Sequence, residues 1–94
     1  MSAEVRDDPE RSWYEARVDG HRAGVAAYRL DDEVITFTHT VVEDAYEGRG
    51  VGSALARTAL DDARARGLGV VPQCPFIAGW IERHPDYGDL VRQG

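Results

Sequence analysis

The chain has no lysine and only one cysteine. All eleven of its Lys/Arg-type charges are arginines, and Cys74 has no second cysteine with which to form an internal disulfide. A lone cysteine is typical of a reducing compartment. Long apolar runs are also absent, and the first twelve residues are charged where a signal peptide is apolar. We therefore expect no membrane span and a cytoplasmic location.

Positive charge is scarce as well, because 17 acidic residues against 11 arginines give a formal net charge of −6. Nonspecific nucleic-acid binding needs a basic face that displaces counterions, so we expect no nucleic-acid partner. The histidines, His21, His39 and His84, are far apart, and none has a cysteine at ligand spacing. No metal site is therefore predicted. The G-x-S-x-G pattern of serine hydrolases is also missing.

Length and composition indicate one globular domain. The 94 residues, of which 43% are apolar, are enough to bury a core. Residues 1–12 are rich in charge, contain Pro9 and have no apolar period. We predict a flexible N-terminal tail over residues 1–12 and a folded domain over residues 13–94.

The first part of the domain has the pattern of an antiparallel meander of three strands. Trp13 to Val18 alternates between apolar and charged residues, and Asp19-Gly20 is a strong hairpin turn signal. His21 to Leu30 is then expected to return antiparallel to it. After a second turn at Asp31-Asp32, Glu33 to Val42 is rich in β-branched residues, which favours a third strand.

The period then becomes helical. From Val51 to Arg66 apolar residues recur on one face, and Gly67 is a ready C-cap. A right-handed crossover makes the short apolar run Leu68 to Val71 a strand parallel to the third one. Pro75 suits the first turn of a second helix, which His84-Pro85 ends. The predicted fold is α/β, with a mixed sheet, a crossover helix and a C-terminal helix.

The stretch from Val41 to Leu55, VVEDAYEGRGVGSAL, joins the third strand to the first helix through Gly48, Gly50 and Gly52. The first turn of a helix has amides without internal partners and a partial positive charge, and glycines allow a ligand to come close. A phosphate group is the natural ligand. A Walker loop requires a lysine, and a dinucleotide fingerprint has the spacing G-x-G-x-x-G, so both fit poorly.

This stretch resembles the coenzyme A pyrophosphate loop of the GNAT N-acetyltransferase superfamily, Gln/Arg-x-x-Gly-x-Gly/Ala. Gly50 and Gly52 fill the small positions, whereas Glu47 stands where glutamine or arginine is expected, and Arg49 offers a positive charge nearby. The run from Phe37 to Val91 is similar to small single-domain members of that superfamily. A minimal GNAT-like fold is therefore expected, in which two parallel strands splay apart around coenzyme A.

The resemblance implies an enzyme that transfers an acetyl group from acetyl-CoA, its cosubstrate, to a primary amine of unknown identity. It implies that the backbone of Val41 and Val42 pairs with the pantetheine arm and that backbone amides near Val41 polarise the thioester carbonyl. It also assigns the pyrophosphate to a set of consecutive amides. These belong to Arg49, Gly50, Val51, Gly52 and Ser53. A tight turn with no ligand is the alternative for the glycines.

Cys74 and His39 are the candidate catalytic residues. Cys74 precedes the helix that Pro75 opens, where a helix dipole favours the thiolate. It is a candidate nucleophile, a candidate proton donor to the coenzyme A thiolate, or a small buried hydrophobe. His39 shares a strand face with Phe37 and is a candidate general base or a core residue.

Other residues offer weaker alternatives. Glu43 and Asp44 are candidate bases or solvated loop acids, and Tyr87 resembles by rough position the tyrosine that protonates the thiolate, with packing as its other explanation. Two rival functions also remain, a coenzyme A binding module without turnover and a protein interaction module. The sequence is compatible with a monomer or a homodimer.

Overall fold

Five strands form one mixed sheet in the computed structural model, which describes residues 3–92. The strands follow one another in chain order, and every neighbouring pair is antiparallel except the last, β4 with β5. The strands are β1 (Glu4–Asp8), β2 (Trp13–Val18), β3 (His21–Asp31), β4 (Val34–Val42) and β5 (Gly69–Pro72). The helices are α1 (Val51–Ala65) and α2 (Pro75–Arg83), with 3-10 turns η1 (Asp44–Tyr46) and η2 (Pro85–Leu90). The predicted mixed sheet with a crossover helix is confirmed.

The predicted turns are found where the sequence indicates them. Asp19 and Gly20 have φ of +51° and +81°, the left-handed conformations that a tight hairpin between β2 and β3 needs. Asp32, between β3 and β4, has φ of +46°. Gly67 follows α1 with φ of +70°, as expected of a residue that ends a helix.

The antiparallel part of the sheet has four strands, one more than the sequence predicts. The additional strand is β1, which lies within the segment 1–12 predicted to be a tail, and pairs with β2 from Glu4↔Arg17 to Asp8↔Trp13. Its charged residues lack an apolar period, so the periodicity argument misses it. Backbone pairing with β2, contact of Val5 with the core and a hydrogen bond of 2.6 Å from the Tyr28 hydroxyl to Asp7 hold it in place.

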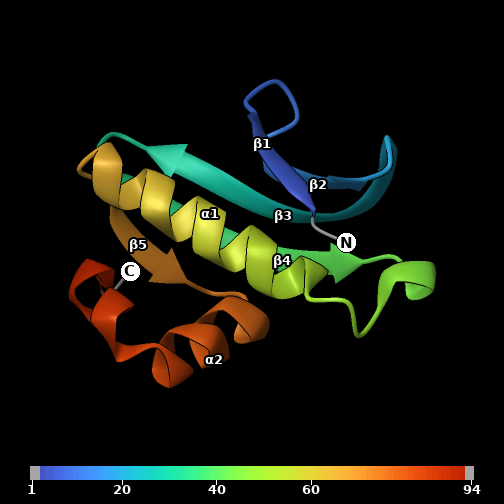
Figure 1. The fold of residues 1–94 in the computed structure, drawn as a ribbon. Helices are drawn as coiled ribbons and strands as arrows, with labels where there is room; N and C mark the ends of the chain where they lie inside the picture. Colours follow the sequence, from blue (N-terminus) through green and yellow to red (C-terminus); the bar gives the residue numbers. More distant parts are fainter. Residues whose placement is uncertain (1–2, 93–94) are drawn as a thin grey trace.

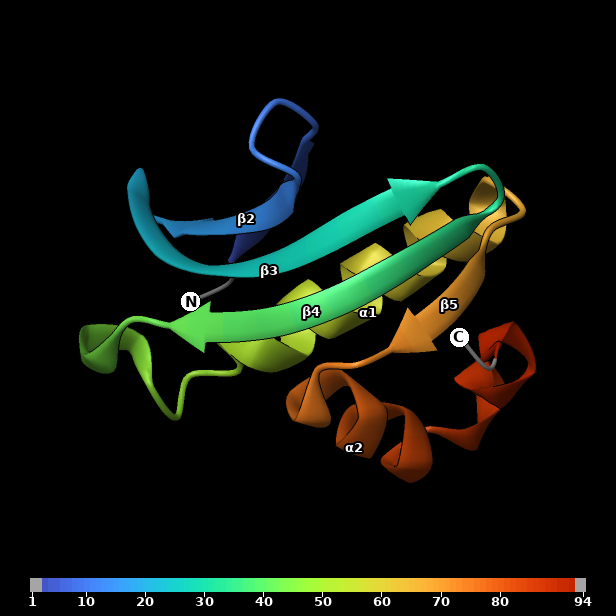
Figure 2. The same cartoon turned by 180° about the vertical axis from the view of Figure 1, so that it is seen from behind.

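Helix α1 covers one face of the sheet (Figure 1), and seen from behind the strands lie in front of it (Figure 2). Its sheet-facing side is fully buried and matches the face predicted from helical periodicity. The buried residues on that side include Leu55, Ala56, Ala59, Leu60 and Ala63. Small alanines let the helix lie close to the strands, where the rings of Tyr14, Tyr28 and Phe37 pack against one another.

One tyrosine–aspartate pair connects the sheet to α1, and a second one connects two strands of the sheet. The hydroxyl of buried Tyr14 donates a hydrogen bond to Asp62 on α1, and that of Tyr28 donates to Asp7 on β1. The guanidinium of Arg66 lies 3.4 Å from the Asp62 carboxylate and 3.7 Å from that of Asp7, so it joins the two pairs. Burial, followed by these hydrogen bonds, raises the pKa of both phenols well above their usual range.

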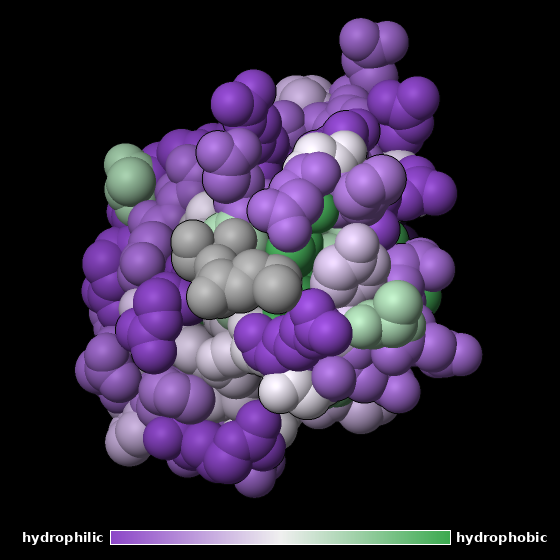
Figure 3. Space-filling view, turned by 45° about the vertical axis from the view of Figure 1, so that its right-hand side comes forward, coloured by the Kyte–Doolittle hydropathy of each residue, from purple (hydrophilic) through white to green (hydrophobic). Residues whose placement is uncertain are grey.

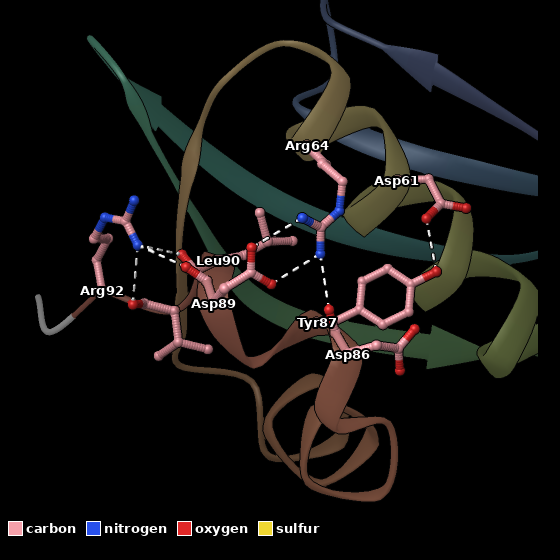
Figure 4. A network of polar contacts seen from close by, with 8 residues as sticks. Asp61, Arg64, Asp86, Tyr87, Asp89, Leu90 and Arg92 are labelled. Atoms are coloured by element: carbon pink, nitrogen blue, oxygen red, sulfur yellow. Dashed lines mark hydrogen bonds and ion pairs between the residues drawn. The ribbon is translucent and has the colours of Figure 1, made fainter.

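The C-terminal segment is fastened to α1 by a separate polar network (Figure 4). Arg64 binds the Asp89 carboxylate through two bonds of 2.9 Å, and its Nη2 also donates to the carbonyl of Asp86. The buried Tyr87 donates to Asp61 at 2.7 Å. These contacts hold η2 beside α1 and thereby fix the end of α2.

The surface turned toward the viewer in Figure 3 is mainly hydrophilic, with apolar residues in small separate areas. That surface agrees with a chain in which 30% of the residues are charged. Within residues 3–92, no helix has the length and apolar character needed to cross a bilayer.

Candidate active site

The connection from β4 to α1 has the form that the sequence predicts. It runs through η1 and then through two glycines in the left-handed region, Gly48 with φ of +78° and Gly50 with φ of +79°. Residues with a Cβ adopt such φ values at a cost of about 1–2 kcal/mol, which explains the glycines. Gly50 is the N-cap of α1, so the turn delivers the chain directly into the helix.

The N-terminus of α1 has no cap from a side chain. Gly50 offers none, and the first turn contains no acidic residue. The first intrahelical bond runs from the amide of Ala54 to the carbonyl of Gly50. The amides of Val51, Gly52 and Ser53 therefore precede the helical ladder and point toward whatever lies before the helix. This end of α1 has the donors and the partial positive charge that suit an anion.

A cavity of about 560 Å³ lies against this helix end. Its wall comes from the second half of β4, the glycine turn, the first turn of α1 and one side of α2. The lining residues are Thr40, Val42, Glu47, Gly48, Gly50, Gly52, Ser53, Phe76, Trp80, Arg83 and His84. Segments far apart in the sequence thus meet at one hollow.

Gly52 lies directly beneath an aromatic ring. A Cβ added to Gly52 would be 2.7 Å from the Cζ atom of Phe76, so the ring would have to shift to admit it. Phe76 lies in the first turn of α2 and is 38% exposed, so its ring stands at the mouth of the cavity. The small residue at position 52 therefore serves the contact between α1 and α2.

Strand β4 has a free edge beside the cavity. Its pairing with β5 stops at Phe37↔Pro72, and the last bond across this boundary runs from the Cys74 amide to the Phe37 carbonyl, at 2.9 Å. Residues 38–42 of β4 continue beyond that point, paired with β3 alone among the strands. The two parallel strands thus separate where the cavity begins.

Alternation along β4 decides which backbone groups face this edge. The Glu43 amide donates to Ala23 on β3, and the Val41 carbonyl lies only 2.7 Å from a Cβ added to Gly24 on β3. Backbone groups of alternate residues point the same way, so those of Val41 face β3. The groups of Thr40 and Val42 face the free edge. Of the two valines predicted to bind pantetheine, Val42 is the one directed to the cavity.

An irregularity at Thr38 moves His39 away from this site. Ala27 pairs with His39 and Tyr28 with Phe37, so Thr38 is an extra residue on β4. Such a bulge reverses the alternation that follows it. The prediction that His39 shares a face with Phe37 is therefore wrong. His39 is exposed on the side of the sheet opposite α1, whereas the cavity is lined by its neighbour Thr40.

Cys74 lies behind Thr40. Cys74 is 2% exposed, and its Sγ is 3.3 Å from the hydroxyl oxygen of Thr40, a residue that lines the cavity. Cys74 is also the N-cap of α2, with Pro75 in the first turn, as the sequence predicts. The Thr40 side chain thus lies between the Cys74 thiol and the cavity.

The remaining candidates lie at the rim or outside it. Glu43 and Asp44 are exposed, and neither lines the cavity, whereas Glu47 does. Arg49 is exposed with its guanidinium 5.8 Å from the centre of the Tyr46 ring. Tyr87 is buried away from the cavity, and its hydrogen bond to Asp61, followed by burial, raises the pKa of the phenol. The packing explanation for Tyr87 is the one that the structure supports.

Sequence reasoning missed the contribution of α2 to this site. Phe76, Trp80, Arg83 and His84 recur at intervals of four, three and one residues and line the cavity as one helix face. From the sequence, His84 is predicted only to end the helix. The spacing of these residues could have indicated the site, because residues three and four positions apart lie on the same face of a helix.

Hydrogen bonds and stacking fix this face of α2. The Trp80 indole donates to the Ser53 hydroxyl at 2.9 Å, and the His84 ring stacks on Trp80 with centroids 3.8 Å apart. The His84 Nδ1 is 2.7 Å from the Trp80 carbonyl, which can only accept, so Nδ1 donates and Nε2 is the acceptor of the neutral ring. Across residues 3–92, no three His, Cys, Asp or Glu side chains are grouped as a metal site requires.

Comparison with protein families gives one clear similarity. Residues 13–90 match the model of the family described as GCN5-related N-acetyl-transferase. Protein NATD1 of Mus musculus is 31% identical over 83 residues, which cover 86% of this chain and 76% of that protein. Protein NATD1 of Homo sapiens is also 31% identical over 83 residues, covering 86% of this chain and 74% of its own length.

Solved structures share the fold. A GCN5-like putative N-acetyltransferase from Staphylococcus aureus superimposes with a TM-score of 0.73 at 24% identity, over 97% of this chain and 89% of its own. A ribosomal-protein-alanine N-acetyltransferase from Brucella melitensis biovar Abortus 2308 gives a TM-score of 0.61 at 21% identity, over 87% of this chain and 62% of its own.

Proposed function

The chain belongs to the GCN5-related N-acetyltransferase family, and from this membership we propose that it binds acetyl-CoA and transfers the acetyl group to a primary amine. The observation that carries the proposal is the uncapped N-terminus of α1, which meets the free edge of β4 at one cavity. A diphosphate and an extended amide-containing arm are the two groups that such a surface suits. Coenzyme A contains both in one molecule.

The proposed arrangement uses backbone groups for binding. The amides of residues 49–53 hold the diphosphate, aided by the partial positive charge at the start of α1. The free backbone groups of Thr40 and Val42 pair with the pantetheine arm as an added strand would, and we assign this role to Thr40 in place of Val41. The Arg49 guanidinium balances the negative charge of Glu47 at the rim.

In the proposed reaction, the amine nitrogen attacks the thioester carbonyl carbon and the carbon–sulfur bond breaks. The acetyl group ends on nitrogen, the coenzyme A sulfur leaves as a thiolate, and the nitrogen releases one proton. Cys74 supplies a proton to the thiolate through the Thr40 hydroxyl, 3.3 Å from its Sγ, and is reprotonated by the one that the amine releases. We favour this role over that of nucleophile because the thiol is buried behind Thr40.

A coenzyme A binding protein without turnover is the second candidate. The observation that favours it is the position of His39, the candidate base, on the far side of the sheet from the cavity. In the proposed reaction the amine therefore has to enter as its free base, without help from His39.

Turnover separates the two candidates. The purified chain is incubated with acetyl-CoA and a panel of polyamines, peptides and protein N-termini, and release of the coenzyme A thiol is followed. Because the chain has no lysine, acetylation of its own lysines does not contribute. Thiol release that depends on an amine supports the enzyme. Saturable binding without release across the panel supports the binding protein, and absence of binding contradicts both.

A further inference from the structure

One end of the cavity is cationic in a chain whose net charge is −6. The cavity extends from the glycine turn along α2 as far as Arg83, the last residue of the helix, and His84, its C-cap. The diphosphate in the proposed function occupies the glycine end. With the pantetheine arm along the free edge of β4, the α2 end is left for the adenosine side of the ligand.

Arg83 has no protein partner in residues 3–92. Arg11, Arg17, Arg29, Arg64 and Arg66 all form ion pairs with carboxylates there, whereas no ion pair or hydrogen bond engages the Arg83 guanidinium. The side chain folds back along α2, with Nη1 3.5 Å from the position of a Cβ on Gly79. An exposed, unpaired guanidinium at the wall of a cavity is available to an anion from outside the protein.

His84 offers a different group beside it. Its Nδ1 is used by the Trp80 carbonyl and its ring is stacked on the indole, so the ring plane is fixed. The neutral ring then presents Nε2 as a hydrogen-bond acceptor. The α2 end of the cavity thus combines a donor with fixed positive charge and an acceptor for a hydroxyl.

We propose that Arg83 and His84 form a subsite for a 3′-phosphorylated ribose, in which the Arg83 guanidinium binds the phosphate and the His84 Nε2 accepts from the adjacent 2′-hydroxyl. This inference rests on the proposed function, because it requires coenzyme A in the cavity. Its consequence is selectivity for coenzyme A over 3′-dephospho-coenzyme A. The two ligands differ only in the phosphate that Arg83 would bind.

The test is a calorimetric titration of both ligands into wild type, Arg83→Gln, His84→Phe and a control. Arg6→Gln is the matched control, because Arg6 also forms no ion pair with any residue from 3 to 92 and lines a separate cavity beside β1. Because only coenzyme A can form the charge-assisted hydrogen bond with Arg83, wild type should bind it about tenfold more tightly than the dephospho form. Arg83→Gln removes this preference, and Arg6→Gln retains it.

His84→Phe distinguishes the two halves of the subsite. Phenylalanine keeps a ring for stacking on Trp80 but has no acceptor. Because both ligands carry the 2′-hydroxyl, this variant should weaken both by the same factor, about threefold to tenfold, and leave their ratio unchanged. Circular dichroism checks that the variant is folded. An unchanged affinity for both ligands overturns the role of His84.

The outcomes separate this inference from the function on which it rests. Equal binding of the two ligands by wild type overturns the subsite while coenzyme A binding stands. An equal loss of preference in Arg6→Gln and Arg83→Gln also overturns it, since the effect would then be one of net charge. Absence of binding by either ligand contradicts the proposed function itself.

Discussion

The indole Nε1 of Trp80 donates a hydrogen bond of 2.9 Å to the hydroxyl of Ser53. Trp80 is 1% exposed at the centre of α2, and Ser53 belongs to the first turn of α1. The bond therefore joins the two helices at the wall of the cavity. It also occupies the indole donor, which is costly to leave unsatisfied when buried.

Removal of this acceptor should destabilise the fold. We expect Ser53→Ala to lower the free energy of unfolding by about 0.5–1 kcal/mol, because the lost hydrogen bond outweighs the better helix propensity of alanine. Urea denaturation measures the change. Thr58→Ala, on the same helix, is the control for propensity. A Ser53→Ala variant as stable as Thr58→Ala would contradict the assigned contribution of the bond.

Because the proposed proton transfer uses both Thr40 and Cys74, substitution of either residue should slow turnover. Cys74→Ser and Thr40→Val should each lower kcat by about tenfold or more, since proton transfer by a positioned group contributes at least this much. Intact-mass measurement after incubation with acetyl-CoA should find Cys74 unacetylated. An acetyl-thioester at Cys74 would contradict the donor role and restore the nucleophile. Full activity in both variants would remove the pair from the mechanism.

His39 is expected to be dispensable. Its side chain lies on the sheet face opposite the cavity, so His39→Gln should keep kcat and KM for acetyl-CoA within about twofold of wild type, the effect of a surface substitution. Steady-state kinetics with the best amine of the panel test this. A large fall in kcat, together with a changed pH profile, would mean that the acceptor approaches across the open face.

Tyr14 and Tyr28 predict a loss of stability in base. Burial, then the hydrogen bonds to Asp62 and Asp7, raise the pKa of both phenols above the ordinary value of 10.0. Above about pH 10 the phenols of Tyr14 and Tyr28 therefore lose their protons in the unfolded chain and keep them in the folded chain. The two tyrosines therefore contribute their full stabilisation to the free energy of unfolding below about pH 10. As the pH rises above that value, this stabilisation is lost and the free energy of unfolding falls.

Urea denaturation between about pH 8 and about pH 11 measures this slope across the tyrosine range. The double variant Tyr14→Phe/Tyr28→Phe should have a shallower slope than wild type. Tyr46→Phe, which removes a phenol outside the cluster, is the control and should keep the wild-type slope. Equal slopes in wild type and the double variant would contradict the shifts.

The sequence predicted the elements more completely than the site. Strong local signals such as the alternation of Trp13 to Val18, the Asp19-Gly20 turn and Pro75 at the start of a helix are properties of the chain itself. Strand β1 was missed because it is held by pairing with β2 and by the Tyr28–Asp7 bond, which are tertiary contacts. A charged segment without alternation of apolar and polar residues gives no indication of such tertiary contacts.

The site depends on features that spacing does not encode. A single extra residue at Thr38 sends His39 to the opposite face, and the sequence of β4 marks no such bulge. The position of Arg83 and His84 at the cavity follows from α2 lying beside the start of α1, an arrangement to which the Trp80–Ser53 bond contributes. Glycines at 48 and 50, by contrast, were predictable because left-handed backbone restricts the residue type.

The most direct test of the account is a titration of acetyl-CoA into wild type, Ser53→Glu and Ser53→Gln. A glutamate in the first turn of α1 favours the helix by about 0.3–1 kcal/mol but repels a diphosphate bound to the same amides. We predict saturable binding by wild type and Ser53→Gln, and at least tenfold weaker binding by Ser53→Glu, about 1.4 kcal/mol, with a thermal midpoint equal to or higher than that of Ser53→Gln, which loses the same hydroxyl. Equal affinity in wild type and Ser53→Glu, or no binding by folded wild type, would contradict the claim that α1 holds coenzyme A.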